Sequence, residues 1–140
     1  MELQESKIVV TFFDRNRLRV LIDSEKSIGK TNDKILYLLE NKLKKAEVVL
    51  PENVPEDIIT MNSKFVYLDM GTGNSKEYTI VYPKDADIDI KRISILTPVG
   101  SSLFGHAVGD AIEVEVPAGR VKIRIEKLLF QPEAHGIYIS

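Results

Sequence analysis

The chain has 140 residues, 44% hydrophobic and 29% charged, which is typical of one globular domain or a small domain with an appendage. It contains no cysteine, which excludes disulfides, thiolate metal sites and thiol nucleophiles. The net charge of −2 is unevenly divided, with +3 in residues 1–46 and −5 in residues 47–140. An acidic body is poorly suited to nucleic-acid phosphates and better suited to a basic protein partner, so we expect no recognition of a specific DNA sequence.

The N-terminus predicts neither a secretory signal nor a membrane span. Met1–Lys7 is mostly polar, and the apolar run Ile8–Phe13 has only six residues, whereas a span needs about 20 apolar residues. We therefore expect a cytoplasmic protein without membrane association.

Two helices are expected in the first third of the chain. Thr11 and Asp14 have the spacing of a capping box, although Asp14 itself is a competing N-cap. Either start places three apolar residues on one helical face: Leu18, Leu21 and Ile22. The pattern breaks over Ser24–Thr31, which predicts a loop of about eight residues around Gly29.

The second helix is expected to begin at a cap formed by Thr31 or Asn32, with Asp33 in its positively polarised first turn. Its apolar residues form a narrow seam for a neighbouring helix: Leu36, Leu39, Leu43 and Ala46. Together the helices predict a short antiparallel, coiled-coil-like hairpin, with arms of about 12–15 residues and about 18–22 Å.

The two prolines of Leu50–Pro55 predict a linker that ends the helical region. Aromatic and β-branched residues then favour two strands, at 64–68 and 77–82, joined by the turn-forming cluster Gly71–Asn74. These strands predict a β-hairpin.

A second strand pair is predicted at 112–116 and 121–125, where apolar and charged residues alternate around a turn at 117–119. Its charged residues are expected to face each other on the wet side of the sheet, Glu113 and Glu115 opposite Lys122 and Arg124.

The segment Ile93–Asp110 lies between the two strand pairs. It predicts a short strand that ends at Thr97–Pro98, then one or two helical turns before Gly105. Its apolar residues are expected in the core: Ile93, Ile95, Leu103, Phe104 and Val108. We therefore predict an α+β protein with a helical hairpin at residues 1–49 and an antiparallel β-sheet domain with one short helix at residues 50–140.

Several sequence blocks resemble a known family. Four of them are similar to the signature of the C-terminal domain of the GreA/GreB transcript-cleavage factors: Ile93–Ser94, Thr97–Gly100, Leu103–Gly105 and Val108–Asp110. Four more, within about 36–136, look like the branch of regulators of nucleoside diphosphate kinase (Rnk): Val54–Pro55, Ile59–Ser63, Val81–Pro83 and Phe130–Ala134. The resemblance implies an FKBP-like β domain that docks on bacterial RNA polymerase at the mouth of its secondary channel, with the hairpin pointing inward.

The resemblance also implies a docking corner, made of Thr97, Pro98, Val99 and Gly100. In Gre factors a Ser-Pro pair of this loop touches a protruding coiled coil of the polymerase, and Thr97 here retains the hydroxyl of that serine.

Three acids lie at or near the expected hairpin tip: Asp23, Glu25 and Asp33. Gre factors use a pair of tip acids to hold a catalytic Mg²⁺ in the polymerase, and carboxylate oxygens suit that ion. Here the arms are short, and Lys26 and Lys30 lie beside the acids. We interpret the three as exposed charges at helix ends, which are common.

The favoured function is a non-catalytic regulator of transcription elongation that binds RNA polymerase and competes with Gre factors. We expect no catalytic residue, metal, cofactor or small-molecule substrate. Two enzymatic alternatives are transcript cleavage through the tip acids and peptidyl-prolyl isomerisation, which an FKBP-like fold implies. An isomerase site is an aromatic-lined pocket, and the helix region offers only Phe104.

Overall fold

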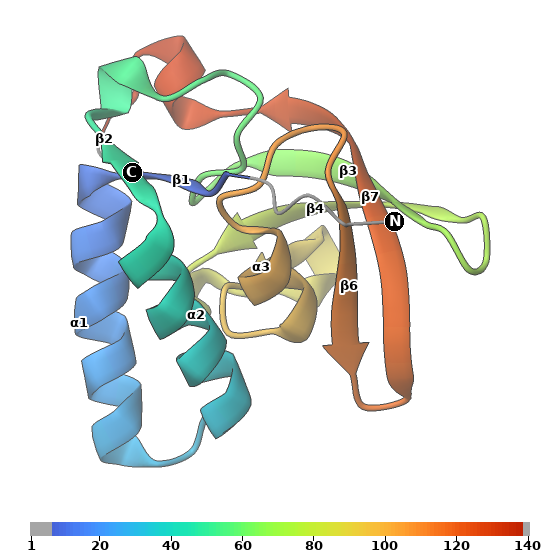
Figure 1. Ribbon diagram of the computed structural model, residues 1–140, viewed down its shortest axis with the longest axis horizontal. Coiled ribbons are helices and arrows are strands. Elements are labelled where there is room, and N and C mark those ends of the chain that lie inside the picture. The colour runs from blue at the N-terminus through green and yellow to red at the C-terminus, as the bar shows by residue number, and fades with distance from the viewer. Residues whose placement is uncertain (1–6, 139–140) are drawn as a thin grey trace.

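The computed structural model describes residues 7–138, which form a helical hairpin beside a curled five-stranded sheet (Figure 1). The elements are β1 (Val9–Thr11), α1 (Phe12–Ile28), α2 (Asp33–Lys45), β2 (Glu47–Val49), β3 (Lys64–Asp69), β4 (Ser75–Val81), β5 (Arg92–Ser94), α3 (Pro98–Leu103), β6 (Ala111–Val116) and β7 (Gly119–Phe130). Short 3₁₀ turns follow β2, β4 and β7, at Pro51–Asn53, Pro83–Asp85, Ile88–Ile90 and Pro132–His135. The α+β class is confirmed.

Both helices of the hairpin begin at predicted caps. The Thr11 hydroxyl accepts a hydrogen bond from the Asp14 backbone N–H at 3.2 Å, so Thr11 is the N-cap of α1 and Asp14 lies inside the helix. Asn32 caps α2 by accepting from the Lys34 N–H at 2.8 Å. These starts follow from local chemistry, because each cap satisfies a backbone donor of the first helical turn.

The predicted loop over Ser24–Thr31 is wrong. Helix α1 runs 17 residues to Ile28, and Gly29 ends it in a left-handed conformation with φ of 73°. The polar residues after Ser24 therefore complete the last turn of α1. One of them, Lys26, forms a 2.6 Å ion pair with Glu40 of α2 and joins the two arms near the tip.

A parallel pair of three-residue strands closes the base of the helical hairpin, where no strand was expected. Val9 lies opposite Glu47, and the register continues to Thr11 and Val49. Strands this short show no alternation that a sequence pattern can reveal. The Val9 N–H also donates to the Gly105 carbonyl at 3.1 Å, which attaches this ladder to the body of the protein.

The five-stranded sheet has the order β5-β4-β3-β7-β6 and is mixed. Strands β3, β4, β6 and β7 pair antiparallel as expected, but β5 pairs parallel to β4. The prediction of a purely antiparallel sheet is therefore wrong. The chain makes two 3₁₀ turns between these strands, and this crossover returns β5 in the same direction as β4.

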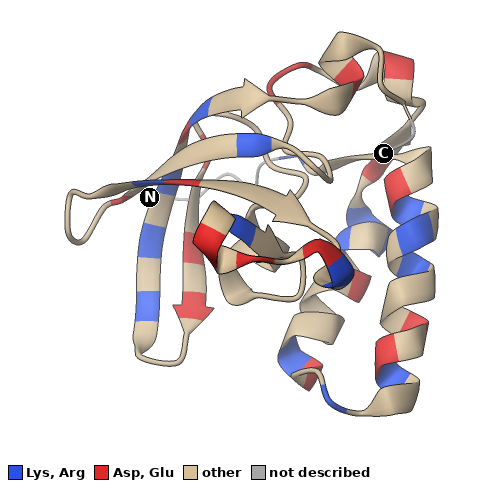
Figure 2. Cartoon of the chain, turned by 180° about the vertical axis from the view of Figure 1, so that it is seen from behind, with Lys and Arg blue, Asp and Glu red and all other residues tan. Residues whose placement is uncertain are grey.

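Charges alternate along the β6–β7 hairpin, with the acids of β6 beside the bases of β7 (Figure 2). Glu113 faces Lys122 as predicted, whereas Glu115 faces Arg120 instead of Arg124. Arg120 forms ion pairs with both acids, at 3.1 Å to Glu113 and 3.4 Å to Glu115. All three side chains are exposed, so these pairs add little to stability.

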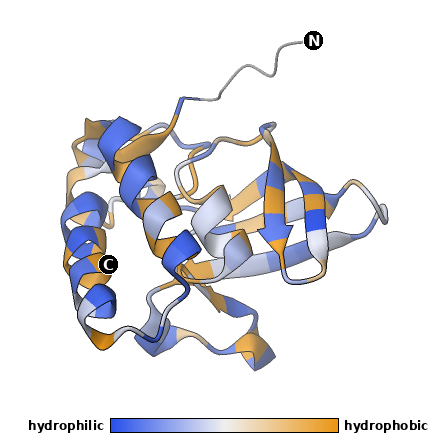
Figure 3. Cartoon of the chain, turned by 60° about the horizontal axis from the view of Figure 1, so that its bottom comes forward, coloured by the Kyte–Doolittle hydropathy of each residue, from blue (hydrophilic) through white to orange (hydrophobic). Residues whose placement is uncertain are grey.

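The helical hairpin and the sheet share one hydrophobic core. Its fully buried members come from every layer: Leu18 of α1, Leu39 of α2, Phe65 of β3, Ile80 of β4, Leu103 of α3, Val114 of β6, and Ile123 and Ile125 of β7. Polar and apolar residues alternate along the β6–β7 hairpin, as Figure 3 shows. Of the predicted core residues, Ile93, Ile95, Leu103 and Phe104 are buried, and Val108 is partly buried against them.

Helix α3 lies between α2 and β6, at the junction of the hairpin and the sheet (Figure 1). Because these elements share one core, the direction of the hairpin relative to α3 is fixed by packing. Within residues 7–138, none of the helices combines the length and the apolar composition needed to cross a membrane.

Candidate functional site

The docking corner forms the start of α3. Thr97 is the N-cap of this helix, and its hydroxyl accepts from the Gly100 N–H at 3.1 Å while donating to the Ser94 carbonyl at 2.7 Å. Pro98 occupies the first helical position, where its missing N–H costs no hydrogen bond. The corner is therefore held rigidly by its own sequence.

The residues of the corner differ in exposure. Thr97, Pro98 and Val99 are partly exposed, whereas Gly100 is buried. A Cβ atom at Gly100 would lie 2.5 Å from the Ser94 carbonyl oxygen and 2.9 Å from Thr97 Oγ1. Gly100 thus allows α3 to pack closely against the end of β5, and the surface of the corner consists of the other three residues.

A cleft of about 540 Å³ opens beside Pro98. It is bounded by the start of α2 and by the end of β6, through Asn32, Lys34, Ile35, Leu38, Glu113, Glu115, Val116 and Pro117. The helical hairpin therefore forms part of the surface next to the docking corner.

Lys42 of α2 anchors the other end of α3. Its buried ammonium donates to the carbonyl oxygens of Ser101, Ser102 and Phe104 at 2.8, 2.7 and 2.8 Å. Burial lowers the pKa of Lys42 to about 7, while the three acceptors match the three protons of its charged form. No acid within residues 7–138 forms an ion pair with it. A lysine in an amphipathic helix is ordinarily a surface residue, so the sequence pattern did not reveal this contact.

A second buried polar cluster joins α1 to two loops of the body. The Asp14 carboxylate accepts from the Met61 backbone N–H at 3.1 Å. Nearby, the Thr60 hydroxyl donates to Glu133 at 2.7 Å. The Gln131 amide donates to the carbonyls of Pro55, at the end of the linker, and of Ile58, both at 2.8 Å. Three of the Rnk-like blocks therefore meet here, through contacts more than 70 residues apart in sequence.

The carboxyls of this cluster have perturbed pKa values. Burial raises the pKa of Asp14 to about 7, against the opposing effects of the Met61 hydrogen bond and the Arg17 guanidinium. Burial also raises the pKa of Glu133, while its bond to Thr60 opposes the change. The negative charge of Glu133 adds to the shift at Asp14.

The three tip acids are dispersed around the end of the hairpin. Asp23 is exposed on α1, Glu25 accepts a hydrogen bond from the Thr31 hydroxyl, and Asp33 is the exposed first residue of α2. Within residues 7–138, no three His, Asp or Glu side chains gather closely enough to hold a metal ion.

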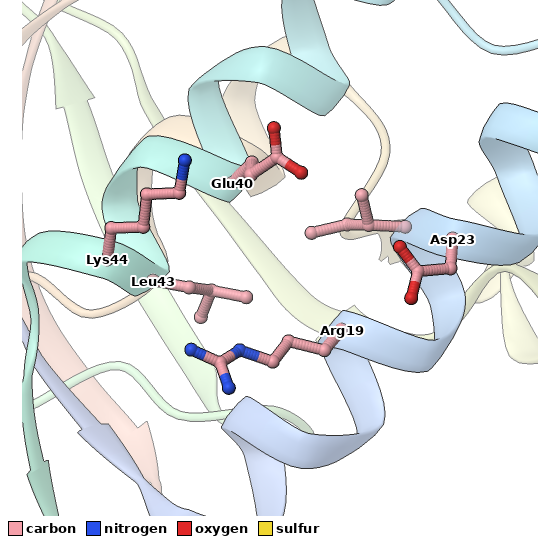
Figure 4. Close-up of a pocket in the computed structure, with 6 residues that line it drawn as sticks. Arg19, Asp23, Glu40, Leu43 and Lys44 are labelled. Atoms are coloured by element: carbon pink, nitrogen blue, oxygen red, sulfur yellow. The ribbon is translucent and has the colours of Figure 1, made fainter.

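Asp23 borders a small cleft of about 250 Å³ inside the hairpin. Figure 4 shows Arg19 and Asp23 of α1 on one side and Glu40, Leu43 and Lys44 of α2 on the other. The mixture of charges and core residues is that of an ordinary interhelical seam.

Each histidine is engaged in a local contact, and Phe104, the aromatic residue that follows α3, is inaccessible. His106 Nδ1 lies 3.2 Å from Asp110, and burial lowers the pKa of His106 to about 4, so its ring is neutral. His135 stacks on Phe130 with ring centroids 4.9 Å apart. Phe104 is only 1% exposed, so it does not line an open aromatic pocket of the kind that an isomerase needs.

Comparison with known proteins points to one family. Residues 54–129 match the family model described as transcription elongation factor GreA/GreB, C-terminal. The chain is 32% identical over 133 residues to the regulator of nucleoside diphosphate kinase of Escherichia coli K12, which covers 94% of this chain and 96% of that protein. It is 40% identical over 90 residues to the transcription elongation factor GreA of Acetivibrio thermocellus, with 64% and 57% covered. A solved GreA/GreB elongation factor from Nitrosomonas europaea superposes with a TM-score of 0.73 at 36% identity, covering 90% of this chain and all of that one.

Proposed function

Because the chain belongs to the GreA/GreB family of transcription elongation factors, we propose that it binds RNA polymerase near the secondary channel and regulates elongation without catalysing a reaction. The observation that carries this proposal is the docking corner. Thr97, Pro98 and Val99 form a partly exposed surface on a helix that is capped at one end and anchored by Lys42 at the other. A preorganised contact of this kind binds with little ordering cost.

The proposed partner is the polymerase itself, through a protein–protein contact made by residues 50–140. We take the resemblance to FKBP to be one of architecture, since the buried Phe104 offers no aromatic pocket. We also propose that the chain competes with Gre factors for the same binding site on the polymerase, because it shares their C-terminal region.

Transcript cleavage is a weaker candidate. The longer arm, α1, has 17 residues and spans about 26 Å at the ordinary helical rise. At the tip of the hairpin, Asp23 belongs to α1 and Asp33 to α2. The Glu25 carboxylate accepts a hydrogen bond from the Thr31 hydroxyl. This arrangement does not favour two acids holding one Mg²⁺.

Binding to purified RNA polymerase tests the docking corner. The double variant Pro98→Ala/Val99→Asp removes one apolar contact and adds a charge at the centre of the corner, so its capture by immobilised polymerase is expected to fall by about tenfold or more. Leu129→Asp adds the same charge at an exposed apolar residue of β7 and serves as the matched control, with capture equal to wild type. Equal capture of the double variant, with circular dichroism showing it folded, contradicts the assignment.

A further inference from the structure

The cleft beside Pro98 lies between the first half of α2 and the start of α3. It has a volume of about 540 Å³, and Pro98 belongs both to its lining and to the docking corner. Lys42, in the last turn of α2, joins the two helices by donating to three carbonyl oxygens within residues 101–104. Because the helices are tied together in this way, the cleft is a preformed hollow that needs little ordering when a partner binds.

The wall that α2 contributes carries apolar side chains beyond those of its buried seam. Ile35 and Leu38, three residues apart, lie on the flank of α2 that lines the cleft. Ile35 packs partly against the core, but Leu38 remains 36% exposed. Val116 and Pro117, at the end of β6, line the same cleft. A partner that covers these side chains would gain hydrophobic free energy that the folded chain alone leaves unused.

The charges around the cleft do not favour a nucleic acid. Lys34 comes from α2, and Glu113 and Glu115 come from β6. Both acids pair with Arg120, so the local charges are close to balanced. A polyanion such as RNA needs a concentrated basic surface. The cleft therefore suits an apolar side chain of a protein partner.

The docking corner alone is too small for a stable protein–protein contact. Specific contacts of ordinary size use about 20–30 residues on each side, whereas the surface of the corner consists of Thr97, Pro98 and Val99. A partner that sits on Pro98 must therefore cover neighbouring surface as well. The cleft is the hollow that Pro98 borders, so it is the continuation of the corner.

We propose that RNA polymerase places an apolar side chain in this cleft, against Leu38 and Val116, so that α2 of the hairpin is part of the docking surface. The inference rests on the proposed function and extends its contact beyond residues 50–140. It gives the hairpin a role in binding that requires neither a metal ion nor the tip acids.

The affinity of the full chain for purified RNA polymerase tests this contact. Leu38→Asp places a charge in the cleft and is expected to weaken binding by about tenfold or more. Leu38→Ala only truncates the side chain and is expected to weaken binding by about fivefold, so it replaces Leu38→Asp if that variant does not fold.

Val20→Asp is the matched control. Val20 is a 71% exposed residue of α1 and lines a different groove, between α1 and the loop after β4. The variant adds the same charge to an exposed apolar residue of the hairpin, and we expect it to bind like wild type. Denaturant titration of each variant confirms that it is folded.

The outcomes distinguish this inference from the proposed function. Wild-type affinity in the Leu38 variants, together with weak binding of Pro98→Ala/Val99→Asp, overturns the inference and leaves the docking corner in place. Wild-type affinity in Pro98→Ala/Val99→Asp removes the corner, and with it the argument for the cleft. An equal loss in Val20→Asp and Leu38→Asp also overturns the inference, because the effect would then not depend on the cleft.

Discussion

Replacing Lys42 with Met is expected to lower the free energy of unfolding by about 3–5 kcal/mol, the loss associated with breaking a buried, charge-assisted network. The ammonium is the donor shared by the Ser101, Ser102 and Phe104 carbonyls at the end of α3. Methionine fills a similar volume but donates no hydrogen bond. Three buried acceptors would then lose their partner, and each such loss costs about 1–3 kcal/mol before relaxation or entry of water.

This effect is measured by comparing the free energies of unfolding of Lys42→Met and of the control variant Lys45→Met in denaturant titrations. Lys45 is exposed on the same helix, so its replacement is expected to change stability by no more than about 0.5 kcal/mol. Amide exchange of residues 101–104 is expected to accelerate in Lys42→Met, because the last turn of α3 loses its anchor. A loss of less than about 1 kcal/mol in Lys42→Met would show that the contact is not an anchor.

Replacing Asp14 with Asn is expected to change the pH dependence of stability. Burial raises the pKa of Asp14 to about 7 from a model-peptide value of 3.8, so the native state binds this proton more tightly than the unfolded state. Stability contributed by this group therefore falls as pH rises from about 4 to about 7, and the full penalty is present above that range. The shift corresponds to a penalty of at most about 4 kcal/mol.

Asparagine at position 14 keeps an oxygen that accepts the Met61 N–H bond and carries no charge. Asp14→Asn is therefore expected to be more stable than wild type by about 2–4 kcal/mol near pH 8, and within about 1 kcal/mol of wild type near pH 4. Urea unfolding at the two pH values measures the difference, with the exposed Asp33→Asn as control. If the stability difference between Asp14→Asn and wild type had the same size at both pH values, burial would not control the titration of Asp14.

Local features of this fold could be predicted from the sequence. The caps at Thr11 and Asn32, the seam of α2 and the alternation of β6 depend on residues within a few positions of each other. The end of α1 was misplaced because polar residues after Ser24 suit both a loop and an exposed helical turn. Gly29, in its left-handed conformation, is the residue that actually stops the helix.

Long-range features escaped prediction for a common physical reason. The parallel pairing of β5, the β1–β2 ladder and the contacts of Lys42 each join segments distant in the chain. Lys42 was missed because its burial depends on α3, about 60 residues away. Asp14 was recognised only as a helix-start residue, since its burial depends on the Met61 loop and on Glu133.

The residues of the docking corner could be predicted from the sequence, but which of them are exposed and how the corner is held follow only from the structure. The family resemblance singled out Thr97–Gly100, and the structure divides this set into a partly exposed surface and a buried glycine that supports it. The Rnk-like blocks also contain Thr60 and Glu133, to which the sequence assigns no binding or catalytic role. The structure brings these two residues together beside Asp14 of α1, in the buried carboxyl cluster.

The central claim, that the chain binds RNA polymerase without acting as a cleavage factor, is tested most directly on stalled, backtracked elongation complexes. The protein is added alone and then in increasing excess over a Gre factor, and the length of the RNA is followed. Alone it is expected to leave the RNA intact, and in excess it is expected to suppress Gre-stimulated cleavage, whereas Pro98→Ala/Val99→Asp is expected not to compete. Shortened RNA with the protein alone, or undiminished Gre cleavage at saturating concentration, would contradict the claim.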